Sequence, residues 1–168
     1  METIKDITTP IGRMRICASP AGLRSVTLLR MNQESTNSVP DFLSILEEAE
    51  TQLLGYFSGK AKQFDLPLDW SGMPEFRRIA LQKAFHIPWG EVITYAELAR
   101  LAGSPQGARA AGGALAHNPF LIVVPCHRVV ASDGSLHGFS AEGGIKTKQQ
   151  LLEFEGHGVL NGKVIFTK

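Results

Sequence analysis

The chain has 168 residues, of which 43% are hydrophobic and 20% are charged, and its 17 basic and 16 acidic side chains nearly cancel. This length excludes a large multidomain enzyme, and this composition excludes a largely disordered chain. No apolar run approaches the roughly 20 residues that a membrane helix needs, and the N-terminus lacks a signal-peptide pattern, so we expect a cytoplasmic protein without membrane contact.

The first predicted elements form a β-hairpin. Two β-like runs cover residues 13–17 and 23–29. Pro20 and Gly22 lie between the runs, and both residue types favour a tight turn. The two runs are therefore expected to pair as antiparallel strands.

A helix and a linker follow the hairpin. Apolar residues recur on one helical face between residues 42 and 57, with Asp41 as the expected N-cap and Gly59 as the stop. A short β-like stretch, residues 63–68, then leads into a turn-rich linker, residues 69–72.

The charge balance changes at this linker. Residues 1–75 contain 7 basic and 10 acidic side chains, whereas residues 76–168 contain 10 and 6. The C-terminal part is thus mildly basic, which permits an anionic partner there. We place a domain boundary at the linker, with an N-terminal α/β domain over residues 1–70 and a C-terminal domain over residues 71–168.

The C-terminal part begins with three predicted helices. The first starts at Pro74 and ends before Ile87. The next two cover residues 95–101 and 106–117, and a turn that contains Gly103 joins them. Two helices joined in this way have the pattern of a helix-turn-helix.

A fully apolar run, Phe120–Val124, is short and branched, which favours a buried strand that ends just before Cys126. A Gly-rich loop over residues 134–144, an amphipathic helix over residues 145–154 and a β-like tail complete the chain. The predicted class is α+β: a small N-terminal antiparallel sheet plus a helix, followed by a mostly helical C-terminal domain with the helix-turn-helix.

Cys126 and His127 are the first candidates for chemistry. Cysteine acts as a nucleophile in its thiolate form, and a nearby imidazole or cation, such as Arg128, lowers its pKa. Adjacent side chains on a regular element do not face each other, so we expect a bridging water between thiol and imidazole. The alternative is a buried structural cysteine. The other cysteine, Cys17, is distant in sequence, which indicates neither a disulfide nor a cysteine-rich zinc site and suits a reducing compartment.

The second helix of the helix-turn-helix, residues 107–117, is rich in Ala and Gly and offers almost no side chains that read base edges. Small residues let its backbone approach another surface closely, where Arg109 would enter a base stack or pair with a phosphate. The alternative is a helix packed tightly within the protein, with Arg109 in solvent.

Four strings in the C-terminal part combine a Pro-Cys-His-Arg motif with an upstream Asn-Pro and a small-residue helix that carries one arginine. They are GEVITYAELARLAG (90–103), GARAAGGALAHNP (107–119), IVVPCHRVV (122–130) and GGIKTKQQLLEFEG (143–156). Together they resemble the methylated-DNA–protein-cysteine methyltransferases, also called O6-alkylguanine-DNA alkyltransferases. Residues 1–70 resemble the family's variable N-terminal domain in size and element order, which implies a ribonuclease-H-like fold.

The resemblance implies a role for each active-site residue. Cys126 is the nucleophile and alkyl acceptor, and His127 is the base that activates it through a water. Glu155 orients and charges the histidine. Asn118 is the hinge that connects the helix-turn-helix to the active-site turn.

The resemblance also implies how DNA is held. Tyr95 donates a hydrogen to the flipped base and crowds its phosphate, and Arg109 fills the gap that the extruded base leaves, with its helix in the minor groove. The remaining expected contacts to DNA or to the base come from three serines, Ser104, Ser132 and Ser140.

The implied activity is direct-reversal DNA repair. A methyl or larger alkyl group passes once from O6-alkylguanine in double-stranded DNA to Cys126, in a suicide reaction with base flipping, and O4-alkylthymine stays open as a second substrate. We expect no cofactor and a monomer. We expect no metal, because the N-terminal domain contains Cys17 as its one cysteine and contains no histidine, the first histidine of the chain being His86. The loop 138–144 is longer than the family pattern and lacks its tyrosine, which leaves the range of alkyl groups open.

Three alternatives stay in view. A non-catalytic alkylated-DNA-binding protein would have the cysteine replaced, so Cys126 counts against it. A cysteine hydrolase would use Cys126, His127 and Glu155 as a triad and would turn over repeatedly. A helix-turn-helix regulator would need a polar recognition helix and usually a dimer.

Overall fold

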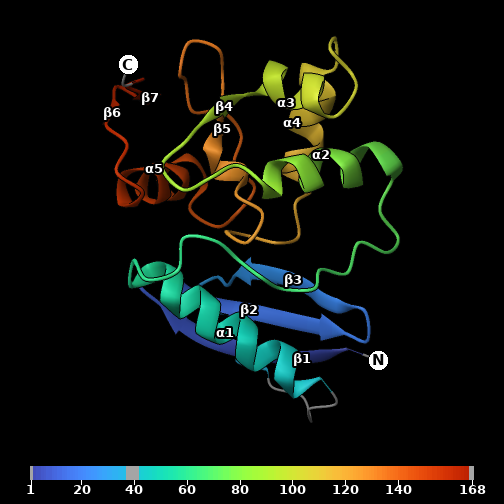
Figure 1. Ribbon diagram of the computed structural model, residues 1–168. Helices are drawn as coiled ribbons and strands as arrows, with labels where there is room; N and C mark the ends of the chain where they lie inside the picture. The colour runs from blue at the N-terminus through green and yellow to red at the C-terminus, as the bar shows by residue number, and fades with distance from the viewer. Residues whose placement is uncertain (1, 37–41, 167–168) are drawn as a thin grey trace. The chain divides into compact units, whose positions relative to one another are not determined.

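The computed structural model describes residues 2–36 and 42–166 and divides into two compact units (Figure 1). The sheet unit comprises Met1–Gly72 together with Pro119–Val123, and the helical unit comprises Met73–Asn118 together with Val124–Lys168. The fold class is confirmed as α+β, with an N-terminal antiparallel sheet and a mostly helical C-terminal part. No helix among the described residues is long and apolar enough to cross a bilayer.

The sheet has three antiparallel strands in the order β1 (Thr3–Thr9), β2 (Gly12–Ser19) and β3 (Gly22–Leu28). The predicted hairpin is confirmed as β2 and β3. No local pattern predicted β1, because only Ile4 and Ile7 are apolar in it. Its β conformation depends on pairing with β2, from Thr3↔Ala18 to Thr9↔Gly12.

Helix α1 (Leu43–Phe57) lies across one face of the sheet (Figure 1). It buries four side chains at helical spacing, Leu46, Ala49, Leu53 and Tyr56, which confirms the predicted apolar face. The helix ends before Gly59, whose φ of 73° is favourable for glycine. The predicted N-cap, Asp41, lies outside the described residues.

The predicted β-like stretch over residues 63–68 is not a strand. Only Leu68 forms an isolated bridge, to Leu23. The Leu23 N–H donates to the Pro67 carbonyl at 2.7 Å, and a Cβ on Gly22 would lie 2.3 Å from that same oxygen. Glycine at position 22 therefore allows the backbone at Pro67 and Leu68 to lie directly against the hairpin.

The predicted strand Phe120–Val124 is also wrong. Phe120 forms one isolated bridge with Val26, and the chain then turns, with Ile122 at a φ of 71°. The apolar run correctly indicated burial, since residues 120–124 are almost completely inaccessible. Burial does not require an extended backbone, and hydrophobicity alone does not distinguish a buried strand from a buried turn.

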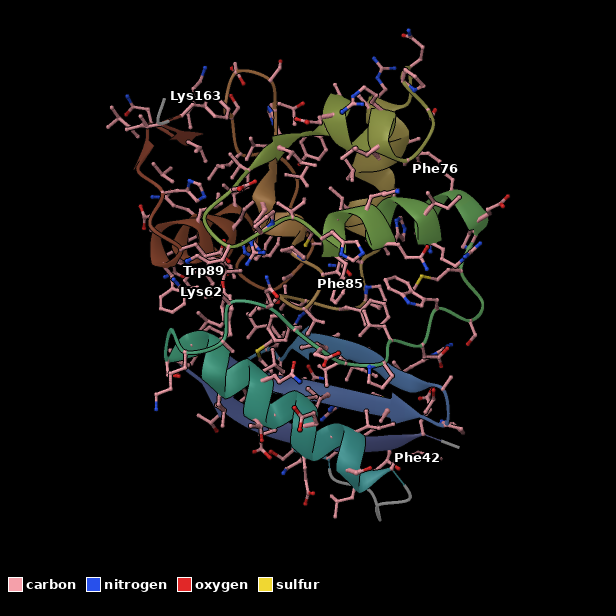
Figure 2. All side chains as sticks on the ribbon, viewed as in Figure 1. Phe42, Lys62, Phe76, Phe85, Trp89 and Lys163 are labelled. Atoms are coloured by element: carbon pink, nitrogen blue, oxygen red, sulfur yellow. The ribbon has the colours of Figure 1, made fainter. Side chains whose placement is uncertain are left out.

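The helical unit contains the predicted helices as α2 (Glu75–Phe85), α3 (Tyr95–Leu101), α4 (Ala108–Ala116) and α5 (Gly144–Phe154). Helices α3 and α4 contact each other and α2, which confirms the helix-turn-helix. Three buried alanines, Ala80 of α2, Ala102 at the end of α3 and Ala114 of α4, pack together. Phe76 of α2, labelled in Figure 2, packs against them. Small residues in α4 thus allow close packing inside the protein on its buried side.

Short strands complete this unit. Strands β6 (Val159–Leu160) and β7 (Lys163–Val164) form the predicted β-like tail. Strands β4 (Ile93–Thr94) and β5 (Val129–Val130) pair in parallel, which the sequence did not indicate. Because β4 runs directly into α3 and β5 follows the Cys126 turn, this pairing brings the start of α3 close to the thiol.

Candidate active site

Cys126 lies in a single 3₁₀ turn, η1 (Cys126–Arg128), immediately before β5. The turn is held by backbone hydrogen bonds from Cys126 N–H to the Val124 carbonyl (2.8 Å) and from Arg128 N–H to the Pro125 carbonyl (2.9 Å). All three residues of η1 are buried, and Cys126 is 8% exposed.

Glu155 joins His127 and Arg128 in a buried network. The Nε2 atom of His127 lies 2.7 Å from Oε1 of Glu155, and Arg128 donates to both carboxylate oxygens at 2.8 Å. A third bond runs from Arg128 to the carbonyl of Ile87 at 2.5 Å. We predicted that the positive charge of Arg128 lowers the pKa of the Cys126 thiol. This interpretation is wrong, because the guanidinium is paired with the Glu155 carboxylate.

The electrostatics of this network set the form of the imidazole. Burial would raise the pKa of Glu155, but hydrogen bonds from His127 and Arg128 outweigh it and lower that pKa to about 2. Burial lowers the pKa of His127, with the Glu155 hydrogen bond opposing. A neutral imidazole beside a carboxylate donates its Nε2 hydrogen, so Nδ1 carries the lone pair. This Nδ1 is buried with no hydrogen-bond partner among the described residues, which leaves a base free to accept a proton.

The thiol itself is held in its protonated form. Burial raises the pKa of Cys126, while a hydrogen bond from the Asn118 side chain and the charge of Lys148 oppose this rise. Asn118 also donates from Nδ2 to the Val124 carbonyl at 2.9 Å. Since a thiolate is the reactive form, this site needs a base at the moment of reaction.

Lys148 is a site residue that the sequence reasoning missed. Its side chain is fully buried and donates to the carbonyls of Val129 (2.7 Å) and His137 (3.0 Å), with the Tyr95 hydroxyl at 3.3 Å. Burial lowers the Lys148 pKa to about 8. The signal was present in the pattern of α5, where Lys148 lies on the same face as the buried Leu151 and Leu152.

Replacing Lys148 by Met is expected to slow the reaction of the thiol with iodoacetamide at pH 7 by about tenfold, which corresponds to about one unit in the Cys126 pKa. The physical reason is the loss of a buried positive charge that favours the thiolate. Lys146→Met is the matched control, because Lys146 is exposed on the same helix. Equal rates for both variants would contradict this role.

The same substitution is expected to change how stability depends on pH. The folded-state pKa of Lys148 is lowered from 10.5 to about 8, so between these values the unfolded chain holds one more proton than the folded chain. This group therefore makes the free energy of unfolding rise with pH across that window. Urea titrations from pH 8 to 10.5 would show a less positive slope for Lys148→Met than for the wild type.

The structure gathers some of the predicted site residues and leaves others on the surface. Cys126, Asn118 and Tyr95 share one environment, since burial and the charge of Cys126 both raise the Tyr95 pKa. The residues predicted to contact DNA lie at accessible positions: Arg109, Ser132 and Ser140 are exposed and Ser104 is half-buried.

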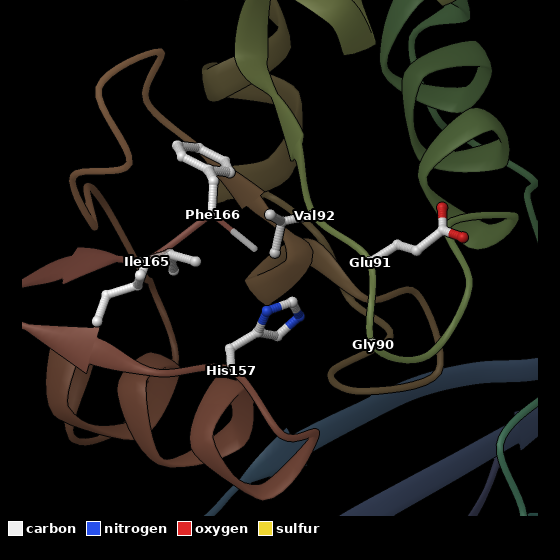
Figure 3. A pocket seen from close by; sticks show the side chains of 7 residues that line it. Gly90, Glu91, Val92, His157, Ile165 and Phe166 are labelled. Atoms are coloured by element: carbon white, nitrogen blue, oxygen red, sulfur yellow. The ribbon is translucent and has the colours of Figure 1, made fainter. Parts of the chain in front are cut away.

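The helical unit also contains a pocket between the loop at Gly90 and the C-terminal strands (Figure 3). None of the predicted site residues lines it; the lining residues are Gly90, Glu91, Val92, His157, Val164, Ile165 and Phe166. No cluster of three or more His, Cys, Asp or Glu side chains with metal-binding geometry occurs in the described ranges.

Comparisons with known proteins agree across the length of the chain. The family profile described as "6-O-methylguanine DNA methyltransferase, ribonuclease-like domain" matches residues 6–70, and the one described as "6-O-methylguanine DNA methyltransferase, DNA binding domain" matches residues 75–157. The methylated-DNA–protein-cysteine methyltransferase of Mycobacterium tuberculosis is 37% identical over 153 residues, which is 90% of each chain.

Solved structures show the same similarity. The crystal structure of Mycobacterium tuberculosis O6-methylguanine methyltransferase has a TM-score of 0.79 at 35% identity and covers 92% of this chain and 93% of that one. A crystal structure of the Mycobacterium tuberculosis protein in complex with DNA has a TM-score of 0.78 at 35% identity, covering 90% and 91%.

Proposed function

The chain belongs to the family of methylated-DNA–protein-cysteine methyltransferases, and on this premise we propose that Cys126 is the residue that takes the alkyl group from O6-alkylguanine in duplex DNA. The activity is direct-reversal repair by a methylated-DNA–protein-cysteine methyltransferase, with double-stranded DNA as the partner. The observation that carries the assignment is the buried turn that holds the Cys126 thiol beside a histidine whose other nitrogen is fixed by Glu155.

The reaction is a displacement at the alkyl carbon. The Cys126 sulfur forms a bond to this carbon, and the bond between the carbon and guanine O6 breaks, so its electron pair stays on guanine. The thiol proton goes to Nδ1 of His127 through a bridging water. The imidazolium that results is stabilised by the Glu155 carboxylate, which already accepts the Nε2 hydrogen.

Guanine must gain a proton as the bond breaks, because its anion is a poor leaving group. The Tyr95 hydroxyl is the proposed donor, and Lys148 lies 3.3 Å from it as an ammonium that returns a proton to the phenolate. A lysine with a pKa of about 8 is a better acid than an ordinary one, so burial suits Lys148 to this role. Overall, one proton leaves the thiol and one reaches guanine, and a thioether replaces the alkyl–oxygen bond.

A thioether has no route back to the thiol within this site, so each protein molecule reacts once. The thiol must also survive unoxidised until it meets damaged DNA. We therefore propose the reducing cytoplasm as the location.

DNA engagement is assigned to the helix-turn-helix. The small residues on the accessible side of α4, such as Gly113, allow its backbone to lie deep in the minor groove. Arg109, exposed in the first turn of α4, is proposed to occupy the space of the extruded base, which offsets part of the few kcal/mol that flipping costs. Phosphate and base contacts are assigned to three accessible serines, Ser104, Ser132 and Ser140.

Peptide mass spectrometry after mixing the protein with a duplex that contains one O6-methylguanine tests this function. We expect one added methyl group on the peptide that contains Cys126, stoichiometric with the protein and not repeated when more damaged duplex is added. Selective binding without modification would instead indicate a damage-binding protein. Repeated cleavage of an ester or peptide substrate would indicate a hydrolase.

A further inference from the structure

Residues 119–123 leave the helical unit and return to it. They belong to the sheet unit, whereas Asn118 and Val124 on either side belong to the helical unit. Cys126 follows two residues after Val124. The chain that carries helix α4 therefore passes through the sheet unit before it reaches the active-site turn.

The tip of this segment is attached to the edge of β3. The Val26 N–H donates to the Pro119 carbonyl at 2.8 Å, and the Val26 carbonyl accepts from the Leu121 N–H at 3.1 Å. Between them, the fully buried Phe120 meets Trp70 edge-to-face, with ring centroids 5.2 Å apart. Backbone and side-chain contacts thus hold the same point.

The backbone beyond the tip is strained. Ile122 has a φ of 71°, a left-handed conformation that is unfavourable for a β-branched residue. Such a conformation persists only where the surroundings hold it in place. Ile122 is completely buried, so the attachment to β3 and the packing around it supply that restraint.

The base of the segment is closed by a residue that also contacts the thiol. Asn118 donates to the Val124 carbonyl at 2.9 Å, across the five intervening residues, and the same side chain hydrogen-bonds Cys126. Asn118 and Val124 are the covalent ends of segment 119–123, so the conformation that β3 holds at the tip bears directly on both of them. Through Asn118, the same conformation bears on the hydrogen bond to the Cys126 thiol.

We propose that the edge of β3, through Val26, Phe120 and Trp70, positions Cys126 for alkyl transfer. These are positioning residues: they hold segment 119–123, which sets the placement of Asn118 and of the turn that carries the thiol. The inference rests on the proposed function, in which Cys126 accepts the alkyl group. It assigns the N-terminal unit a part in the reaction itself.

Two variants weaken the attachment in different ways. Trp70→Leu removes the aromatic contact with Phe120. Val26→Pro removes the N–H that donates to the Pro119 carbonyl. Both backbone groups of Val26 face segment 119–123, so Val26 and Ile16 of β2 form a non-hydrogen-bonded pair. The substitution therefore removes no hydrogen bond between β2 and β3. Leu53→Ala is the control, since it opens a cavity at a fully buried position of α1 in the same unit and removes none of the contacts named above.

The measurements are the single-turnover transfer rate at saturating O6-methylguanine duplex, the Kd for that duplex, and the pH profile of Cys126 alkylation by iodoacetamide. For Trp70→Leu we expect the transfer rate to fall by about tenfold to a hundredfold, as for a displaced reacting atom. We also expect a displaced pH profile and a Kd within about threefold of the wild type. Leu53→Ala, compared at equal loss of stability, is expected to keep the wild-type rate and profile.

Wild-type transfer rates in both attachment variants would overturn the inference. So would a Leu53→Ala variant that loses as much rate as they do at equal stability, because the effect would then be general destabilisation. If Val26→Pro does not fold, the transfer rate and the iodoacetamide profile of Trp70→Leu alone test the inference. If the wild type transfers nothing, the proposed function fails, and the iodoacetamide profile of Trp70→Leu still tests the positioning by itself.

Discussion

Replacing Cys126 by Ala is expected to abolish alkyl transfer while leaving binding to the damaged duplex within about threefold of the wild type. The sulfur is the atom that forms the new bond, so no neighbouring group can replace it. Cys126 is only 8% exposed and its side chain is small, so Ala leaves the surrounding turn intact. Transfer is measured by mass spectrometry of the protein, and binding by titration of a labelled duplex that contains O6-methylguanine.

Cys17→Ala is the matched control for this loss. Cys17 is also buried, and burial together with the nearby Glu2 raises its pKa to about 11, so its thiol is not expected to react. Arg109→Ala should show the opposite behaviour to Cys126→Ala: weaker duplex binding with an unchanged iodoacetamide rate. Transfer to any residue in the Cys126→Ala variant would refute the assigned chemistry.

Replacing Glu155 by Ala is expected to lower the free energy of unfolding by about 3–5 kcal/mol, because it leaves the buried Arg128 without its counter-charge. The carboxylate accepts two hydrogen bonds from Arg128 and one from His127, all at 2.7–2.8 Å. Glu155→Gln keeps the shape and is expected to fold, but to transfer the alkyl group about a hundredfold more slowly, since an uncharged partner does not stabilise the imidazolium. Urea unfolding and single-turnover rates measure the two effects.

Acid titration separates Glu155 from other carboxylates. Its folded-state pKa is lowered from 4.5 to about 2, so its contribution to stability is complete above pH 4.5 and is lost as the pH falls toward 2. Glu155→Gln should lose this acid-dependent part of the stability. Glu153→Gln, at an exposed position near the end of the same helix, should retain it. Identical acid unfolding of the two variants would contradict the coupling.

Local patterns predicted most of the elements. The apolar spacing of α1, the turn residues of the hairpin and the small-residue helix α4 are signals contained within a few turns of chain, and local conformational preference decides such elements. Strand β1 and the pair β4–β5 have no comparable local signal, because they depend on partners distant in sequence. The run 120–124 was correctly predicted as buried but wrongly as extended.

The sequence by itself determined the family resemblance, the α+β class and the residue types of the site, because a Pro-Cys-His-Arg motif with its companion strings is readable along the chain. Only the tertiary structure decided which groups meet. It paired Arg128 with Glu155, placed the Lys148 ammonium 3.3 Å from the Tyr95 hydroxyl and attached segment 119–123 to β3. Such contacts join residues far apart in sequence, and burial changes pKa values only once the fold has excluded water.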